Sequence, residues 1–314
     1  MTADPAFRAD VLAGLAAPIP AVPARWLYDR RGSELFEEIT RLPEYYPTRT
    51  ETALLERHSG EIAARLGTGE AVIEFGSGSS AKTPILLRAV RPAAYVPVDI
   101  SGDFLRDSAA ALQAEFPDLP IHPVEADFTR SFELPGEIAA APKLGFFPGS
   151  TIGNFVARSA VDFLRAMKQT LGEGSRLVIG MDRIKEVDVL VRAYDDAAGV
   201  TAAFNLNLLH RINAELDGDV PVAAFRHRAI WNDEMSRIEM HLEALRDVAF
   251  TVSGEAFAMR AGATIHTENS HKYGHRDSRL LLRAAGWGVV SEWTDEECWF
   301  SILLAEAEPP RFAP

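Results

Sequence analysis

The chain has 314 residues, of which 47% are hydrophobic, and its 32 basic and 45 acidic side chains give a formal net charge of −13. A chain this long with so many apolar residues can bury a large core, which excludes disorder and fibrous repeats and favours two domains. The acidic excess argues against a nucleic-acid partner, because affinity for a phosphate backbone comes mainly from Lys and Arg.

The redox and targeting signals favour the cytoplasm. The single cysteine, Cys298, cannot form an intrachain disulfide or anchor a thiolate zinc site, and we expect it to be buried in a strand. The apolar stretch 11–24 is broken by prolines and preceded by acidic residues, where a signal peptide would be basic. No window approaches the roughly 18 apolar residues that a membrane span needs. We therefore expect a cytoplasmic monomer without a membrane partner.

Strands and helices alternate in the first half of the chain. The apolar run 71–75 ends in a glycine turn that leads into a helical pattern over 82–90. The elements predicted after it are a strand over 95–98, a helix over 104–116, strands over 121–124 and 144–147, a helix over 157–171 and a strand over 177–181. Repeated strand–helix units of this kind imply a parallel, doubly wound α/β sheet.

The pattern changes after residue 181 and returns near the end of the chain. The elements predicted there are a helical region over 187–216, strands over 222–231 and 237–245, a helix over 278–285, a turn over 286–288 and strands over 289–293 and 299–305. We assign residues 56–183 and 273–314 to a nucleotide-binding domain, and residues 1–55 and 184–272 to a second domain of mixed helices and strands.

The turn after the first predicted strand has the residues of a nucleotide-binding site. Gly76 and Gly78, with Ala81 at the third position, match the loose dinucleotide pattern, in which small residues let backbone amides and a helix N-terminus approach a ligand. Asp99, at the end of the second predicted strand, is placed to bind ribose hydroxyls. NAD and S-adenosylmethionine both offer such hydroxyls, so these residues leave both ligands open.

Two further acids favour S-adenosylmethionine. Glu74 precedes the turn, where a carboxylate repels a pyrophosphate but can hold the cationic methionine end or its water shell. Asp127 follows the third predicted strand and could bind the exocyclic amine of adenine while Phe128 stacks on the ring. Lys82 could reach the methionine carboxylate. The predicted cofactor-binding residues are Glu74, Gly76, Ser77, Gly78, Lys82, Asp99, Asp127 and Phe128. The alternative is that these acids only cap helices and end strands.

Longer motifs resemble a known family. They are WLYD at 26–29, GSELF at 32–36, ITRLPEYYPTR at 39–49, EFGSGS at 74–79, FPGSTIGNF at 147–155 and YDDAAG at 194–199. With them the chain resembles, from about residue 26 to its end, the L-histidine Nα-methyltransferases, which make hercynine, the trimethylated histidine of ergothioneine biosynthesis. The resemblance implies a class I S-adenosylmethionine-dependent methyltransferase domain with a Rossmann-like sheet, and a family-specific substrate-binding α+β domain.

The resemblance also implies the roles of seven side chains. Tyr28, Asn154 and Tyr194 correspond to positions that hold the amino and carboxylate groups of histidine, and we take the first two as catalytic. An amide can donate to the carboxylate and accept from an ammonium, and a tyrosine hydroxyl is similarly two-sided.

The other four correspond to positions around the imidazole. Tyr45, Glu268 and Ser270 match positions that hold it, and Met240 matches a pocket wall. An ionised Glu268 would bind an imidazole N–H strongly, and Ser270 is two residues further along an extended segment, on the same face. Without the family match, Tyr45 could equally be packed in a turn, and Met240 would more often be core.

The predicted reaction is in-line displacement at the sulfonium methyl by the neutral α-amine, repeated up to three times. We expect alignment, rather than a dedicated base, to supply most of the rate enhancement. An NAD-dependent oxidoreductase, a non-catalytic S-adenosylmethionine-binding module and a methyltransferase of another aromatic amino acid such as tryptophan stay as alternatives. The spacings of His266, His271 and His275 suit no standard metal-binding pair on one helix, so we predict no metal.

Overall fold

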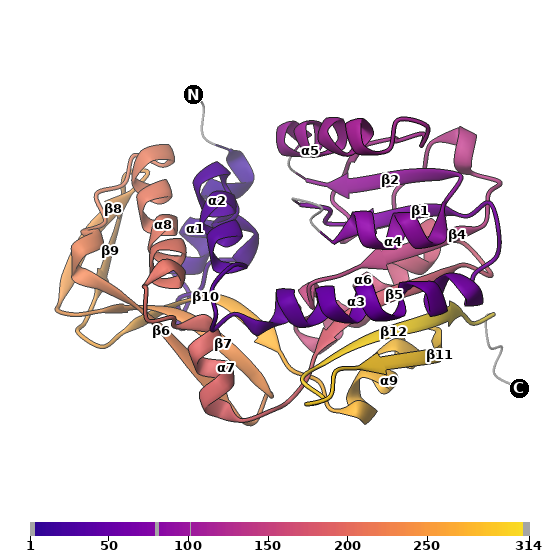
Figure 1. Ribbon diagram of the computed structural model, residues 1–314. Coiled ribbons are helices and arrows are strands. Elements are labelled where there is room, and N and C mark those ends of the chain that lie inside the picture. The colour runs from indigo at the N-terminus through magenta and orange to yellow at the C-terminus, as the bar shows by residue number, and fades with distance from the viewer. Residues whose placement is uncertain (1–3, 79–81, 101, 310–314) are drawn as a thin grey trace, which may run out of the picture. The chain divides into compact units, whose positions relative to one another are not determined.

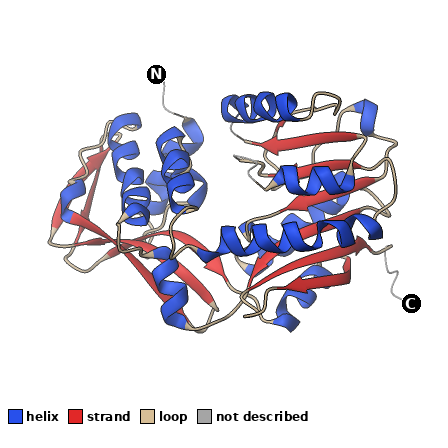
Figure 2. Ribbon diagram, viewed as in Figure 1, coloured by secondary structure: helices blue, strands red, loops and turns tan. Residues whose placement is uncertain are grey.

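The computed structural model describes residues 4–78, 82–100 and 102–309, so Ala81 of the glycine pattern lies outside the described residues. Contacts divide the chain into two compact units. The first, here called the sheet-and-tyrosine unit, comprises Met1–Tyr46 and Lys185–His271, and the second, the nucleotide unit, comprises Pro47–Ile184 and Lys272–Pro314. Figures 1 and 2 show the elements of both.

Among the described residues of the nucleotide unit, seven strands form one sheet in the order β11-β12-β5-β4-β1-β2-β3. They are β1 (Ala71–Phe75), β2 (Ala94–Asp99), β3 (Val124–Glu125), β4 (Lys143–Phe147), β5 (Arg176–Asp182), β11 (Trp287–Thr294) and β12 (Phe300–Ala307). The first five pair in parallel, whereas β12 runs antiparallel to both β5 and β11. The chain order therefore reverses between β1 and β4, which opens a crevice at the carboxyl ends of these strands.

Helices cover both faces of this sheet (Figure 1). They are α3 (Tyr46–Arg65), α4 (Thr83–Val90), α5 (Gly102–Glu115), α6 (Ala157–Leu171) and α9 (His275–Ala284), with the short turns η2 (Gly136–Ile138) and η3 (Thr151–Asn154). Alternate residues of β1 belong to different cores: Ile73 packs with α6 and α9, and Val72 packs with α3 and α4. Burial on both faces explains why β1 is a continuous apolar run rather than an alternating one.

The sheet-and-tyrosine unit combines helices with antiparallel strands (Figure 2). Its helical elements are α1 (Pro5–Leu15), η1 (Ala24–Leu27), α2 (Arg30–Ile39), α7 (Val187–Tyr194), α8 (Val200–Glu215) and η4 (Val222–Ala224). Its strands are β6 (Phe225–Asn232), β7 (Arg237–Ala244) and β10 (Thr264–His271), in the order β10-β7-β6, and the hairpin β8 (Val248–Val252) and β9 (Glu255–Met259). This is the α+β organisation expected of the second domain.

The first boundary between the units differs from the expected one. Residues 47–55 belong to the nucleotide unit, although the sequence assigned them to the second domain. They form the first half of α3, and Leu54, Leu55 and Ile62 of this helix are buried together against the sheet. A continuous helix with one buried face keeps residues 47–55 with the core that its later turns cover.

The predicted helical region over 187–216 is two helices. Asp196 lies between them and accepts hydrogen bonds from the backbone N–H groups of Val200 and Thr201, which begin α8. Gly199 has φ +75°, a conformation that favours glycine. Burial by itself raises the pKa of Asp196, but these hydrogen bonds outweigh it and lower the pKa below its ordinary value. Asp196 therefore acts as an ionised cap that starts α8.

Other differences are local. The expected strand over 121–124 pairs as a strand only at Val124–Glu125, with one isolated bridge from Ile121 to Tyr95. The expected turn over 286–288 contains the buried start of β11 at Trp287. Cys298 is exposed in a turn with φ +56°, so the expectation of a buried strand residue was wrong. No helix in the described parts of the chain has the length and apolarity to cross a membrane.

Candidate active site

The glycine turn is held against the ends of β1 and β2. The backbone N–H groups of Gly76 and Ser77 both donate to the carbonyl of Val98, and the N–H of Gly78 donates to Oδ2 of Asp99 at 3.2 Å. Gly76 and Gly78 have φ +69° and +47°, so both adopt a left-handed conformation. The structure therefore joins the predicted glycines and the predicted acid of β2 into one loop at the crevice.

Phe128 closes over this turn. A Cβ at Gly76 would lie 3.1 Å from Cζ of the Phe128 ring, so only glycine fits there without a shift of the ring. Asp127 is exposed beside it, and its Oδ1 accepts hydrogen bonds from the N–H and the hydroxyl of Thr129. Its other oxygen takes no part in this turn, and a carboxylate oxygen can accept from an adenine amine. Phe128 therefore lies against the glycine turn, and the exposed Asp127 is its neighbour in the chain.

Glu74 is buried more deeply than a direct ligand-binding role requires. Its side chain is 2% exposed, and Oε2 accepts hydrogen bonds from the hydroxyls of Thr83 and Tyr95 at 2.7 and 2.6 Å. Burial raises the pKa of Glu74 to about 7, against the opposing effect of these hydrogen bonds. Glu74 therefore links β1 to β2 and to the first turn of α4, and this placement favours an indirect role in shaping the cofactor loop.

Lys82 is held by an acid that the sequence analysis missed. Its ammonium forms an ion pair with Glu51 of α3, whose carboxylate is 1% exposed and also accepts the N–H of Gly149 at 2.8 and 3.0 Å. Gly180 of β5 lies so close to this carboxylate that it leaves no room for a Cβ. Glu51 therefore connects α3, the start of α4 and the loop that leads from β4 to Asn154.

Asn154 ends η3 and is half-buried. The loop before it is fixed at several points: Gly149 and Ser150 have positive φ angles, the Ser150 hydroxyl oxygen accepts the N–H of Asp182, and the Tyr273 hydroxyl donates to the carbonyl of Ile152. Burial raises the pKa of Tyr273. Asn154 therefore lies in a turn that these contacts hold in place. The turn follows β4, which is the neighbour of β1 in the sheet.

The other six predicted substrate residues belong to the sheet-and-tyrosine unit, where three tyrosines form a cluster. Tyr28 follows η1, Tyr45 precedes α3, and Tyr194 is the last residue of α7. The rings of Tyr45 and Tyr194 lie 6.0 Å apart edge to face, and the ring of Tyr28 lies 5.4 Å from that of Phe204 on α8. The Tyr194 hydroxyl shares a hydrogen bond of 2.7 Å with the Ser270 hydroxyl.

Glu268 faces this tyrosine cluster. Burial, then the negative charge of Glu268, then Tyr45 and Tyr194 raise the pKa of Tyr28 well above its ordinary value. The Tyr28 hydroxyl is therefore protonated at neutral pH and serves as a neutral hydrogen-bonding group. Met240 pairs directly with Glu268 across β7 and β10, which places both on one face of the sheet. The structure thus brings these predicted residues together from five separated segments.

A buried polar network that the sequence analysis missed holds this face in place. Nδ2 of Asn205 on α8 donates to Nδ1 of His227, and Nε2 of His227 donates to the carbonyl of Tyr194 at 2.7 Å. Burial lowers the pKa of His227, which keeps the ring neutral. The Thr267 hydroxyl meets Oδ1 of Asn205 and the carbonyl of Met240. Asn205 therefore connects α8, the end of α7 and the strands that present Met240 and Glu268.

The strand order and the site define a class of protein. A parallel sheet with one antiparallel strand beside β5, a glycine turn after β1 and an acid at the end of β2 are the arrangement of a class I S-adenosylmethionine-dependent methyltransferase. Residues 7–307 also match the model of a family described as histidine-specific methyltransferase, SAM-dependent. The chain belongs to this family.

Named relatives extend over nearly the whole chain. It is 42% identical over 307 residues to the histidine N-alpha-methyltransferase of Mycolicibacterium smegmatis, which covers 96% of this chain and 94% of that protein. It is 32% identical to ergothioneine biosynthesis protein 1 of Neurospora crassa, over 91% of this chain and 33% of that protein. It is 27% identical to an L-tryptophan methyltransferase of Psilocybe serbica, over 96% of this chain and 93% of that protein. The relatives' names include two amino acids, so the substrate must be argued from the site.

Proposed function

We propose that the protein transfers methyl groups from S-adenosylmethionine to the α-amine of L-histidine, three times in succession, and so makes Nα,Nα,Nα-trimethyl-L-histidine for ergothioneine biosynthesis. The observation that carries the choice of histidine is the buried Glu268 carboxylate beside the tyrosine cluster and Ser270. An ionised carboxylate accepts a charge-assisted hydrogen bond, and the imidazole N–H of histidine can donate one.

The protonation of the site depends on Tyr28 and on the methyl donor. The raised pKa of Tyr28 means that this residue is not a phenolate base at neutral pH. A free α-amine has a reference pKa of about 7.7 to 8.0, and the sulfonium of the methyl donor disfavours a neighbouring ammonium. The amine is therefore neutral when it attacks. One C–S bond breaks, one N–C bond forms, the sulfonium becomes a thioether, and the new ammonium releases a proton to water before the next transfer.

Binding at the two ends of histidine keeps the nitrogen in place between transfers. The family resemblance assigns Tyr28, Tyr194 and Asn154 to the amino and carboxylate groups of histidine. It assigns Tyr45, Glu268 and Ser270 to the imidazole and Met240 to the pocket wall. A methylated ammonium is attracted to the face of the Tyr28 ring by about 0.5 to 2 kcal/mol. This attraction persists when the nitrogen has lost its hydrogen-bond donors, which favours processive transfer up to the third methyl group.

The methyl donor binds at the glycine turn of the nucleotide unit. The left-handed glycines let the backbone of the turn approach a ligand, the Phe128 ring beside Gly76 offers a face on which adenine can stack, and Asp99 and Asp127 supply acceptors for ribose hydroxyls and an adenine amine. Lys82, held by Glu51, supplies a cation for the methionine carboxylate. We further propose that the enzyme is a cytoplasmic monomer that uses no metal in the transfer; light scattering coupled to gel filtration tests the monomer.

The first experiment is mass spectrometry of the purified chain incubated with S-adenosylmethionine and an equimolar mixture of the twenty amino acids. Histidine should gain one, two and then three methyl groups, and the intermediates should stay scarce if transfer is processive. Methylation of tryptophan in place of histidine would reject the substrate assignment. Binding of S-adenosylmethionine without turnover of any amino acid would leave a non-catalytic binding protein.

The Glu268→Gln variant tests the imidazole site, and Glu243→Gln is its matched control. Glu243 is an acid on the same sheet that is paired with Arg226 and Arg228. Loss of a hydrogen bond to a charged group costs about 1.5 to 3 kcal/mol, so histidine affinity should fall about 10- to 150-fold in Glu268→Gln. Calorimetry should find S-adenosylmethionine binding unchanged in both variants. An equal loss of both ligands would contradict this division of the site.

A further inference from the structure

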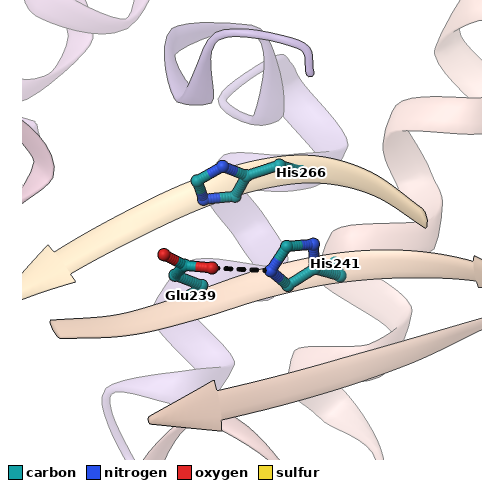
Figure 3. Close-up of side chains that lie close together, drawn as sticks. All are labelled: Glu239, His241 and His266. Carbon is teal, nitrogen blue, oxygen red and sulfur yellow. Dashed lines mark hydrogen bonds and ion pairs between the residues drawn. The ribbon is translucent and has the colours of Figure 1, made fainter. Parts of the chain in front are cut away.

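Three side chains on the other face of the β10-β7-β6 sheet form a cluster of metal-ligand type (Figure 3). Glu239 and His241 are two residues apart on β7, so both project to the side opposite Met240. His266 of β10 pairs directly with His241 in the antiparallel register. One ligand atom from each side chain lies within 4.8 Å of the ligand atoms of the other two. Two imidazoles and one carboxylate thus converge from neighbouring strands.

The cluster is shielded, and its carboxylate is already oriented. The side chains of Glu239 and His241 are 9% and 12% exposed. Oε1 of Glu239 accepts hydrogen bonds from Arg237 at 2.6 and 2.8 Å and from Asn232 at 2.9 Å, so Oε2 faces Nε2 of His241 at 3.0 Å. Hydrogen bonds to the outer oxygen are the support that positions a metal-binding carboxylate. The rings of His241 and His266 stack with their centroids 4.8 Å apart.

We propose that Glu239, His241 and His266 bind one divalent transition-metal ion of the zinc class, through Oε2 and the two Nε2 atoms. Two imidazoles and a carboxylate with an open fourth position suit Zn²⁺, whereas Mg²⁺ and Ca²⁺ take oxygen ligands. Ligands around a tetrahedral Zn²⁺ lie about 3.4 Å apart, so the three atoms draw together when the ion binds.

The proton balance permits this coordination. A nitrogen that binds a metal carries no proton, so each neutral imidazole must keep its proton on Nδ1. The buried Nδ1 of His241 has no hydrogen-bond partner among the described residues, so a proton placed on this nitrogen displaces no existing contact of Nδ1. The hydrogen bond from Nε2 of His241 to Glu239 is replaced by two bonds to the ion. The ion can therefore bind without leaving a new buried charge that has no ligand or partner.

His266 connects this metal site to the substrate face. Its Nε2 donates to the carbonyl of Glu268 at 3.0 Å, across the point where the register of β10 shifts. An ion that takes this nitrogen breaks that hydrogen bond and releases the backbone that positions the Glu268 carboxylate. This step rests on the proposed function. Zn²⁺ then weakens histidine binding by about 2- to 12-fold, the value of one ordinary hydrogen bond.

Metal binding is tested without either substrate. The full chain is stripped with a chelator and titrated with Zn²⁺ by calorimetry, and its metal content is measured after gel filtration. Wild type should bind one ion per chain. His241→Ala and His266→Ala should bind Zn²⁺ more weakly than wild type. The loss should exceed the roughly 10- to 100-fold that follows when a metal ligand loses its hydrogen-bond partner. His275→Ala is the matched control, because His275 is an exposed histidine that pairs with Glu292 outside the cluster, and this variant should bind like wild type.

Two outcomes would overturn the site: no stoichiometric ion bound to folded wild type, or Zn²⁺ affinity in the His241→Ala and His266→Ala variants equal to that of wild type. If a histidine variant does not melt cooperatively, Glu239→Gln replaces it, because the amide keeps an acceptor for Arg237 but loses the charge. Histidine affinity is then measured in wild type with and without Zn²⁺. Absence of histidine binding in both conditions would reject the proposed function while leaving the metal titration intact, so the two failures are distinguishable.

Discussion

Loss of the Glu51 charge should destabilise the nucleotide unit and disturb the methyl-donor site together. The Glu51 carboxylate is buried, and it binds both the Lys82 ammonium and the N–H of Gly149. Removing one partner of a buried ion pair costs about 3 to 5 kcal/mol, because the other charge stays buried without compensation. The side chain of Lys82 is 14% exposed, so water can hydrate its ammonium when Glu51 is replaced. The cost should therefore lie toward the lower end of this range.

Two variants separate the contributions of Glu51. Glu51→Gln keeps an acceptor for Gly149 but removes the charge, so it should lose about 3 kcal/mol, the lower end of that range. Glu51→Ala also leaves the Gly149 N–H without this acceptor and should lose roughly 1 kcal/mol more. Urea unfolding monitored by circular dichroism measures both, and calorimetry measures S-adenosylmethionine affinity, which should fall because Lys82 is no longer held.

A double-mutant cycle with Lys82→Met gives the decisive comparison. If the pair is the source of the effect, the double variant should be more stable than the sum of the single changes predicts, by about 0.5 to 3 kcal/mol. Additive losses would show that Glu51 and Lys82 act independently. A Glu51→Gln variant with unchanged stability and unchanged affinity would refute the argument from burial.

The remaining predictions concern pH and one helix cap. The pKa of Glu74 is raised from 4.5 to about 7, so the folded state binds its proton more tightly and stability should fall as pH rises between these values, by about 3 kcal/mol in all. Glu74→Gln should flatten this slope, measured by urea unfolding between about pH 5 and about pH 8, which lie on either side of the folded pKa. A slope equal to that of wild type would contradict the prediction. Asp196→Ala should cost about 0.5 to 2 kcal/mol through loss of the α8 cap. The exposed Asp195→Ala variant is its control in thermal unfolding, and equal melting temperatures would disprove the cap.

The parallel half of the fold follows from apolar periodicity. The helix expected over 157–171 has the same bounds as α6. It could be predicted because its buried residues recur at helical spacing and a glycine follows it. The hairpin β8–β9 was missed, although its signal was present. Val248, Phe250 and Val252 alternate with exposed residues, and Ser253 and Gly254, both at positive φ, form the two-residue turn that such hairpins prefer.

The candidate-site residues also differ in whether a local sequence pattern could reveal them. Gly76, Gly78 and Asp99 could be found because their spacing along one strand–turn–helix unit is local. The roles of Tyr28, Tyr194 and Glu268 came from family resemblance, since no local pattern joins a tyrosine before α2 to an acid on β10. Glu51 and His241 had no signal in the sequence: their partners are fixed only when separate elements pack together.

The position of β12 has a consequence for synthesis of the chain. Among the described strands β12 is the last in sequence, yet it pairs along the full length of β5. While the ribosome makes the residues between Asp182 and Phe300, a span of 300 − 182 = 118 positions, β5 has no neighbour on one side. At about 5 to 20 residues per second, this interval lasts roughly 6 to 24 s. An unpaired hydrophobic edge strand invites association with other chains, so we expect shielding of β5 until β12 emerges to limit aggregation of the nascent chain.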